Sequence, residues 1–201
     1  MSSTNRSQAR RKHISDYYVT PVEDILTFLH AFSEHEDIFN RDISILDPCA
    51  GGCDENPMSY PTALERFVRD IYGDYGVKHS IVTLDIREDS RAEIIGDYLE
   101  VNMEGLFDVI ITNPPFNIAR SIIEKALNDV REGGWVIMLL RLNYFGSRAR
   151  KDLWDLQMPK YTFVHHKRMS FTNDGKTDSI EYCHMVWKKG YYPEFTKLKV
   201  I

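Results

Sequence analysis

The sequence predicts an α/β protein with a mainly parallel sheet that is covered by helices on both faces. Short apolar runs alternate along the chain with longer segments whose apolar residues recur at helical spacing. This alternation is typical of strands joined by helical crossovers. The expected strands are Ile43–Leu46, Ile81–Leu84, Ile94–Leu99, Phe107–Ile111, Gly134–Leu140, Tyr161–His165 and Tyr182–Trp187.

Helical segments precede the first strand and separate several of the others. Thr20-Pro21 opens the first one, because threonine caps helices and proline fits a first turn. The apolar face of this helix consists of Ile25, Leu26, Phe28 and Leu29. Three further helices are expected at Thr62–Tyr72, Ile118–Val130 and Ser147–Leu156.

The last two expected strands have no helical pattern between them. Only the polar loop Thr172–Asp178 and its flanking residues separate them, so the usual crossover between parallel strands is absent. The sequence therefore predicts a seven-stranded sheet that is mainly parallel and has an antiparallel last strand.

Length and composition indicate one globular domain. The chain has 201 residues, of which 43% are hydrophobic, and we expect residues 14–201 to form a single domain. Residues 1–13 contain four basic and no acidic residues, which predicts a basic, disordered tail. No apolar run has the length of a membrane span or of a signal-peptide core.

The cysteines fit a reducing compartment. Three cysteines are an odd number, which argues against a disulfide framework and favours the cytoplasm. Cys49 and Cys53 lack the spacing of a zinc site, so no metal is predicted. His165 and His166 are neighbours on a strand and point to opposite faces, so one buried and one exposed histidine are expected.

Charge is distributed unevenly along the chain. Residues 14–140 contain 9 basic and 24 acidic residues, whereas residues 141–201 contain 12 basic and 6 acidic residues. The two basic ends could form a surface that attracts a phosphate backbone. Scattered, solvated lysines would give the same count, and the sequence leaves both interpretations open.

Asn113-Pro114-Pro115-Phe116 is the most informative motif. It follows the apolar run Phe107–Ile111, where two prolines cannot continue a sheet ladder and force the chain outward. The motif places a carboxamide, carbonyl oxygens and an aromatic ring at the carboxyl edge of a sheet, where ligands bind in open α/β folds. A simple turn is the alternative reading of these four residues.

Acidic residues follow three other expected strands. Asp47 ends the first strand and is followed by the small-residue loop Pro48–Gly52, which lets backbone amides approach a ligand. Asp85 ends the second strand, where a carboxylate can accept both hydroxyls of a ribose. Asp97 could reach an exocyclic amine of adenine. Each acid taken alone could instead cap a helix, but their order and spacing together favour a nucleoside site.

The chain resembles the class I S-adenosylmethionine-dependent methyltransferases, a Rossmann-like fold. Within them it is most similar to DNA N6-adenine methyltransferases of small phage or prophage type, over most of residues 16–190. Asp16–Pro21 resembles the upstream cofactor segment and Leu46–Gly52 the cofactor loop. The resemblance implies that S-adenosylmethionine is bound by Tyr18, Thr20, Pro21, Asp47, Pro48, Cys49, Ala50, Gly51, Gly52, Asp85, Ile86, Asp97 and Tyr98.

The same resemblance assigns the remaining site. Asn113, Pro114, Pro115 and Phe116 match the catalytic loop, and Phe116 also takes part in binding the substrate. Arg168-Met169-Ser170-Phe171 resembles the segment whose aromatic ring packs on a flipped target base. Arg168 and Phe171 are therefore expected to bind the substrate.

Three departures from the family pattern are visible. The cofactor loop lacks a further glycine after Gly51-Gly52, and Phe116 stands where tyrosine is frequent. No block between Phe116 and Phe171 is long enough for a separate target-recognition domain. Sequence recognition would then depend on short loops, the termini or a partner.

The chemistry expected of this motif is methyl transfer to an amino group, with DNA as the partner molecule. Acceptors on the two hydrogens of an adenine amine expose its lone pair, and the sulfonium methyl is already activated. RNA amino groups, cytosine N4 and a glutamine side chain are alternative acceptors. A cofactor-binding subunit without turnover is a further alternative.

Overall fold

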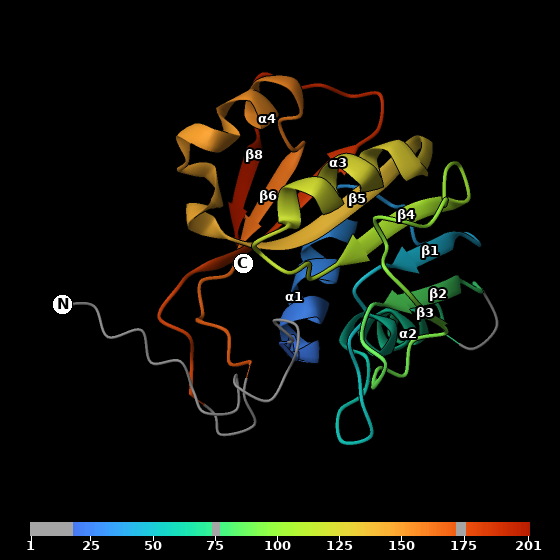
Figure 1. Ribbon diagram of the computed structural model, residues 1–201. Coiled ribbons are helices and arrows are strands. Elements are labelled where there is room, and N and C mark those ends of the chain that lie inside the picture. The colour runs from blue at the N-terminus through green and yellow to red at the C-terminus, as the bar shows by residue number, and fades with distance from the viewer. Residues whose placement is uncertain (1–17, 74–76, 172–175) are drawn as a thin grey trace.

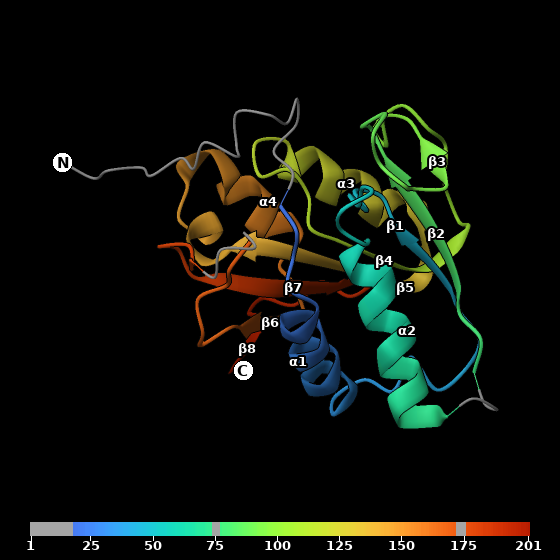
Figure 2. The ribbon, with the colours of Figure 1, turned by 90° about the horizontal axis from the view of Figure 1, so that it is seen from below.

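The structure, a computed structural model, describes residues 18–73, 77–171 and 176–201. One sheet of eight strands runs through it in the order β3-β2-β1-β4-β5-β7-β6-β8. Helices α1 and α2 cover one face of this sheet and α3 and α4 cover the other, as Figures 1 and 2 show. The basic tail 1–13 lies outside the described residues, so its predicted disorder stays a prediction.

The helices and strands follow one another in the expected alternation. The strands are β1 (Ser44–Asp47), β2 (Ser80–Asp85), β3 (Ile94–Ile95), β4 (Phe107–Thr112), β5 (Val130–Arg141), β6 (Tyr161–Val164), β7 (Tyr182–Lys188) and β8 (Lys197–Val200). The α-helices are α1 (Val22–Ser33), α2 (Ser59–Tyr72), α3 (Ala119–Asp129) and α4 (Lys151–Leu156). Short 3-10 turns occupy Leu142–Phe145 and Arg148–Arg150.

The predicted fold class is confirmed, with a correction at the end of the chain. Strands β1 to β5 pair in parallel, and β7 runs antiparallel to both of its neighbours. The antiparallel strand is not the last one, because β8 follows it and pairs in parallel with β6. Sequence analysis missed β8 because Lys197 and Lys199 interrupt its apolar residues, as is common in an edge strand.

The central strands are buried on both faces, and their side chains alternate between two apolar cores. Ile45 of β1 and Val109 of β4 pack with α1 and α2 in one core. Leu46 and Ile110, one residue further along each strand, pack with α3 in the other. This alternation explains the continuous apolar runs, since a strand between two helical layers has no polar face.

The first two helices begin at other residues than expected. Thr20 does not cap α1, because Pro21 occupies the cap position without a side-chain bond and the helix begins at Val22. Helix α2 begins at Ser59 rather than Thr62, so Pro61 lies in its first turn, where its missing amide hydrogen costs nothing.

Three other boundaries differ from the expected ones. Strand β3 contains only two residues, and the chain turns at Asp97 instead of continuing to Leu99. Strand β5 begins at Val130, four residues early, with a register irregularity against β4. The helix expected from Ser147 divides into a 3-10 turn and the short α4.

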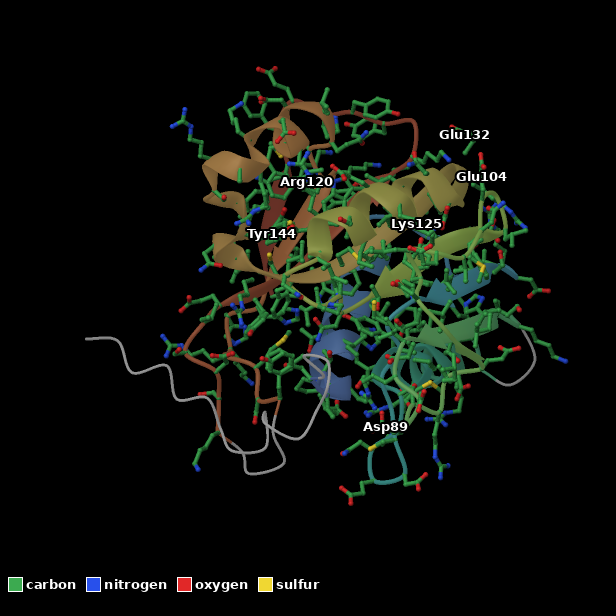
Figure 3. All side chains as sticks on the ribbon, in the orientation of Figure 1. Asp89, Glu104, Arg120, Lys125, Glu132 and Tyr144 are labelled. Carbon is green, nitrogen blue, oxygen red and sulfur yellow. The ribbon has the colours of Figure 1, made fainter. Side chains whose placement is uncertain are left out.

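The carboxyl ends of the parallel strands meet at one edge of the sheet. Asp47 and Asp85 are the last residues of β1 and β2, Asn113 follows β4, and Arg141 ends β5. Figure 3 shows Asp89, on the loop after β2, far from Glu104 and Glu132, which lie at the opposite edge. The parallel pairing therefore gathers the polar residues singled out by the sequence.

Candidate active site

A pocket opens at the carboxyl edge of the sheet, and its empty space, including the solvent at its mouth, is about 770 Å³. Its walls come from the segment before α1, from the loops after β1, β2, β3 and β4, and from the first turns of α2 and α3. The lining residues are Tyr18, Thr20, Pro48, Cys49, Ala50, Gly51, Ser59, Tyr60, Asp85, Ile86, Arg87, Asp97, Tyr98, Asn113, Pro115, Ile118 and Ile122.

Most of the residues predicted to bind the cofactor lie in this wall. The predicted residues that do not line it are Pro21, Asp47 and Gly52. Asp47 is fully buried behind the loop that it precedes. The structure thus brings together residues from four separate loops that the sequence analysis had grouped.

Asp85 ties two of these loops together. Its Oδ2 accepts a hydrogen bond from the backbone amide of Gly51 at 2.7 Å, and its Oδ1 accepts one from the amide of Arg87 at 2.9 Å. The Arg87 guanidinium donates in turn to the carbonyl of Gly52 at 3.0 Å. Because these bonds hold the loop after β1 against the loop after β2, Asp85 shapes the pocket as well as lining it.

Two glycines give the loop after β1 its path. Gly51 and Gly52 have φ angles of 63° and 73°, which residues with a Cβ rarely adopt. A Cβ on Gly52 would also lie 2.6 Å from the Met58 side chain. The loop therefore turns sharply on these two glycines, although the further glycine of the family pattern is missing.

Asp47 is a buried carboxyl. Its Oδ1 accepts from the amide of Cys49 at 3.3 Å, whereas its Oδ2 has no hydrogen-bond partner among the described residues. The pKa of Asp47 is raised to about 7, mainly because the group is buried and to a smaller extent because the charge of Asp85 is near. Near neutral pH this group is therefore divided between a neutral and a charged form.

Asp97 and Tyr98 form the far wall. Asp97 Oδ1 accepts from the backbone amide of Leu99 at 2.9 Å, which fixes the turn after β3. Tyr98 is buried, and the Lys125 ammonium lies 5.0 Å from the centre of its ring. Burial and the neighbouring Asp129 raise the pKa of Tyr98, so its hydroxyl stays neutral.

Asn113 faces the pocket between the acids and the aromatic residues. Its Nδ2 donates a hydrogen bond to the Thr20 hydroxyl at 3.0 Å, and Thr20 is itself buried. With its amino group held in this way, the amide turns its oxygen away from Thr20. The turn that follows is closed by a bond from the Ile118 amide to the Pro115 carbonyl at 3.1 Å.

An aromatic cluster lies beside Asn113. We use this name for Tyr18, Phe116, Phe171 and Tyr182. The Tyr18 ring stacks on Phe116 with 6.3 Å between centroids and meets Phe171 edge-on at 5.6 Å. Tyr182 contacts Phe116 at 5.9 Å and Phe171 at 4.8 Å. The two phenylalanines predicted to contact a base are therefore brought together through tyrosines that the sequence analysis did not place there.

Arg168 is less closely connected to this cluster. Its guanidinium pairs with Glu181 at 3.3 Å, and both side chains are 54% exposed. Such an exposed pair contributes little to stability. The segment from Arg168 to Phe171 thus delivers the ring of Phe171 inward, while its arginine lies at the surface.

Sequence reasoning missed five of the lining residues. They are Ser59, Tyr60, Arg87, Ile118 and Ile122. Tyr60 is fixed by a buried chain, since its hydroxyl and His184 Nε2 lie 3.0 Å apart and His184 Nδ1 lies 2.8 Å from His165 Nε2. Only the unexpectedly early start of α2 places Tyr60 here, and no local pattern indicates it.

The two neighbouring histidines behave as expected. His165 is buried and His166 is exposed. Burial lowers the pKa of His165 to about 4, so the hydrogen-bonded series Tyr60–His184–His165 is uncharged at neutral pH. Within the described part of the chain, no three His, Cys, Asp or Glu residues gather as a metal site would require.

The fold is shared with class I S-adenosylmethionine-dependent methyltransferases. A candidate enzyme of this class from Listeria monocytogenes is 13% identical over 95% of this chain and 68% of its own, with a TM-score of 0.62. A candidate RNA methyltransferase from Pyrococcus horikoshii is 15% identical over 87% of each chain, with a TM-score of 0.60.

The M protein of the type I restriction enzyme EcoKI is also similar. It is 14% identical over 92% of this chain and 48% of its own length, with a TM-score of 0.66. No protein-family model matches the sequence, and no curated protein matches it by sequence. In the described ranges, no helix has the length and apolar character needed to cross a membrane.

The raised pKa of Asp47 should make the free energy of unfolding depend on pH. The ordinary pKa of an aspartate side chain is 3.8 and that of Asp47 in the folded protein is about 7, so the folded protein keeps a proton that the unfolded chain loses between these pH values. The free energy of unfolding contributed by Asp47 is therefore greatest below this window and falls as pH rises through it. Asp47→Asn removes this dependence.

Urea unfolding without cofactor measures the effect. The free energy of unfolding of Asp47→Asn, taken relative to that of the wild type, should rise by at least ~1 kcal/mol between pH ~5 and pH ~8. The comparison between the two pH values cancels the fixed cost of exchanging an oxygen for an amino group. Parallel stability profiles would show that Asp47 has an ordinary pKa.

Proposed function

We propose that this protein transfers the methyl group of S-adenosylmethionine to the exocyclic N6 of adenine in DNA, with the target base flipped out or single-stranded. The proposal rests above all on Asn113, which stands in the pocket wall with its amino group bound to Thr20. A carboxamide oxygen held in this way can accept a hydrogen bond from the adenine amine. Such a bond weakens the conjugation of the nitrogen with the purine ring and exposes its lone pair.

The pocket has the properties that S-adenosylmethionine requires. Asp85 and Asp97 line it, Asp47 lies behind, and the Arg87 guanidinium in the same wall pairs with Asp89, so the field of the site favours a sulfonium cation. Asp85 at the end of β2 is placed to accept the ribose hydroxyls, and Ile86, which is 54% exposed, offers an apolar surface to the adenine ring. The roles of these residues in binding the cofactor are part of the proposal.

Catalysis would depend on positioning. The Asn113 Oδ1 and the Pro114 carbonyl would each accept one hydrogen of the target amine, which favours a pyramidal nitrogen and directs its lone pair toward the sulfonium methyl. Holding two reactants in line contributes up to about 7–11 kcal/mol to the lowering of a barrier. The nitrogen gains the methyl group, the sulfur keeps the bonding electron pair, and the amine's extra proton leaves to water.

The target base would stack in the aromatic cluster. A base inside a duplex cannot reach Asn113, so it must be extruded or already single-stranded. Stacking on one aromatic ring contributes about 1–3 kcal/mol. In the structure the Tyr18 ring stacks on Phe116, so a base that stacks there must displace Tyr18.

RNA is the second candidate substrate, because a candidate RNA methyltransferase matches 87% of this chain with a TM-score of 0.60. A glutamine amide is less well supported, since Phe116 and Phe171 favour a flipped base, and cytosine N4 is a further alternative. We further propose that residues 14–201 form one domain without a separate target-recognition unit, and that short loops read the nucleic acid.

Nucleoside mass spectrometry tests the function directly. DNA and RNA are incubated separately with the protein and methyl-labelled S-adenosylmethionine and then digested to nucleosides. Labelled N6-methyl-2′-deoxyadenosine from DNA supports the proposal. Label in RNA alone, in cytosine or in added protein would contradict it in favour of the corresponding alternative.

Asp85→Ala should weaken the binding of S-adenosylmethionine. The loss of hydrogen bonds to a charged group corresponds to about 1.5–3 kcal/mol, and the loops joined through Gly51 and Arg87 would also separate. Isothermal titration calorimetry gives the affinity. Glu88→Ala, an exposed acid of the same loop, is the matched control and should bind normally. Equal affinities in the two variants would refute the ribose assignment.

Asn113→Ala should abolish most of the chemistry and leave cofactor binding intact. Removing one preorganised hydrogen bond to a transition state lowers a rate by about 10²-fold or more. Rapid-quench measurement under saturating cofactor isolates this step. A single-turnover rate close to that of the wild type would mean that residues 113–116 form a turn without a catalytic role.

Thr20 should affect the rate through Asn113. Thr20→Val keeps the shape but removes the acceptor of the 3.0 Å bond, and a net loss of 0.5–1.5 kcal/mol corresponds to roughly a two- to twelvefold slower transfer. Thr20→Ser should restore the rate. If valine and serine behave alike under saturating cofactor, the hydroxyl does not orient the amide.

A further inference from the structure

Arg141 stands on the opposite side of Asn113 from the acids of the pocket. Across the carboxyl edge of the sheet, Asp85 ends β2, Asp47 ends β1, Asn113 follows β4 and Arg141 ends β5. Arg141 does not line the cofactor pocket. Arg87, the guanidinium on the acidic side, is paired with Asp89, so the edge carries an excess of acidic groups on one side of the amide and a permanent positive charge on the other.

The guanidinium of Arg141 lies against the aromatic cluster. Its Cζ is 4.6 Å from the centre of the Phe116 ring, within the range of a cation–π contact. Arg141 also pairs across the sheet with Tyr182, whose hydroxyl donates to Asp178 Oδ2 at 2.8 Å. A base that stacks on Phe116 would share this ring with the guanidinium.

Arg141 has no carboxylate of its own among the described residues. Its Nε is buried without a hydrogen-bond partner, the Tyr182 hydroxyl is a neutral partner of the guanidinium, and none of the described carboxylates pairs with it. By contrast, Arg120 pairs with Asp152 and Arg131 pairs with Asp108. A half-buried guanidinium whose Nε is unpaired and whose charge has no carboxylate partner is costly unless something else supplies an anionic acceptor.

We propose that Arg141 binds the phosphate of the target nucleotide while its base stacks on Phe116. This inference rests on the proposed function. A guanidinium matches two phosphate oxygens at once, and no carboxylate of the described chain competes for it. The nucleotide would then be oriented at both ends, with its amino group at Asn113 and its phosphate at Arg141.

The arrangement also separates the two reactants by charge. The sulfonium cation belongs with the acids at the ends of β1 and β2, and the phosphate belongs with Arg141 at the end of β5. A nucleotide that entered the cofactor side would bring its phosphate against carboxylates. Arg141 is thus a residue that specifies a nucleotide, rather than any planar amine, as the acceptor.

Binding to a fluorescein-labelled oligodeoxyadenylate, followed by anisotropy over a range of salt concentrations, tests the inference. Every base of this probe is a candidate target. Arg141→Met should weaken binding about ten- to hundredfold at low salt and reduce the slope of log affinity against log salt by about one. Arg141→Lys, which keeps the charge but loses the planar fork, should retain the slope and part of the affinity.

Arg131→Met is the matched control. Arg131 lies on the same strand at its opposite end, 49% exposed and paired with Asp108, and its loss changes the net charge equally. It should leave the affinity and the slope unchanged. Calorimetry with S-adenosylmethionine checks that each variant is folded, because Arg141 lies outside the cofactor pocket.

Two results would overturn the inference. Wild-type affinity and slope in a folded Arg141→Met variant would exclude the contact, and lower affinity with an unchanged slope would assign Arg141 to the base instead of the phosphate. Failure of the proposed function looks different, because the wild type would then bind the probe with an Arg141-dependent slope but transfer no methyl group to any nucleic acid.

Discussion

The parallel pairing of β1, β2, β4 and β5 is the constraint on which the candidate site depends. Parallel strands end at the same edge, so residues separated by dozens of positions in the chain become neighbours there. Each of these strands ends in, or is followed by, a residue with a polar side chain. The helices that cover both faces leave this edge as the place where a ligand can approach the backbone.

Charge is sorted along this edge in the order of the strands. Carboxylates occupy the ends of β2 and β1, a neutral amide follows β4, and a guanidinium ends β5. In a site that binds a sulfonium cofactor and a polyanion, this order gives each reactant a side of opposite charge, so that both can reach the Asn113 amide. The net charge of the whole chain, -5, says nothing about such an order.

The segment from Tyr18 to Thr20 connects parts of the site that are otherwise separate. Thr20 holds the amide of Asn113, and Tyr18 lines the pocket and stacks on Phe116. A ligand in the pocket and a base on Phe116 would therefore both contact this segment. This segment lies in the site because Pro21 is the N-terminal cap of α1, so the helix begins at Val22 and Thr20 stays outside it.

The sequence by itself determined the fold class, the polar residues at the strand ends and the motif Asn113–Phe116, because apolar periodicity and proline act locally. It also grouped most of the pocket, since parallel strands must end together. Only the tertiary structure placed Tyr60 in the wall, turned Thr20 from a helix cap into the partner of Asn113 and brought Arg141 against Phe116. These contacts join residues from different layers of the fold, and their geometry is set by packing between strands and helices that no local pattern records.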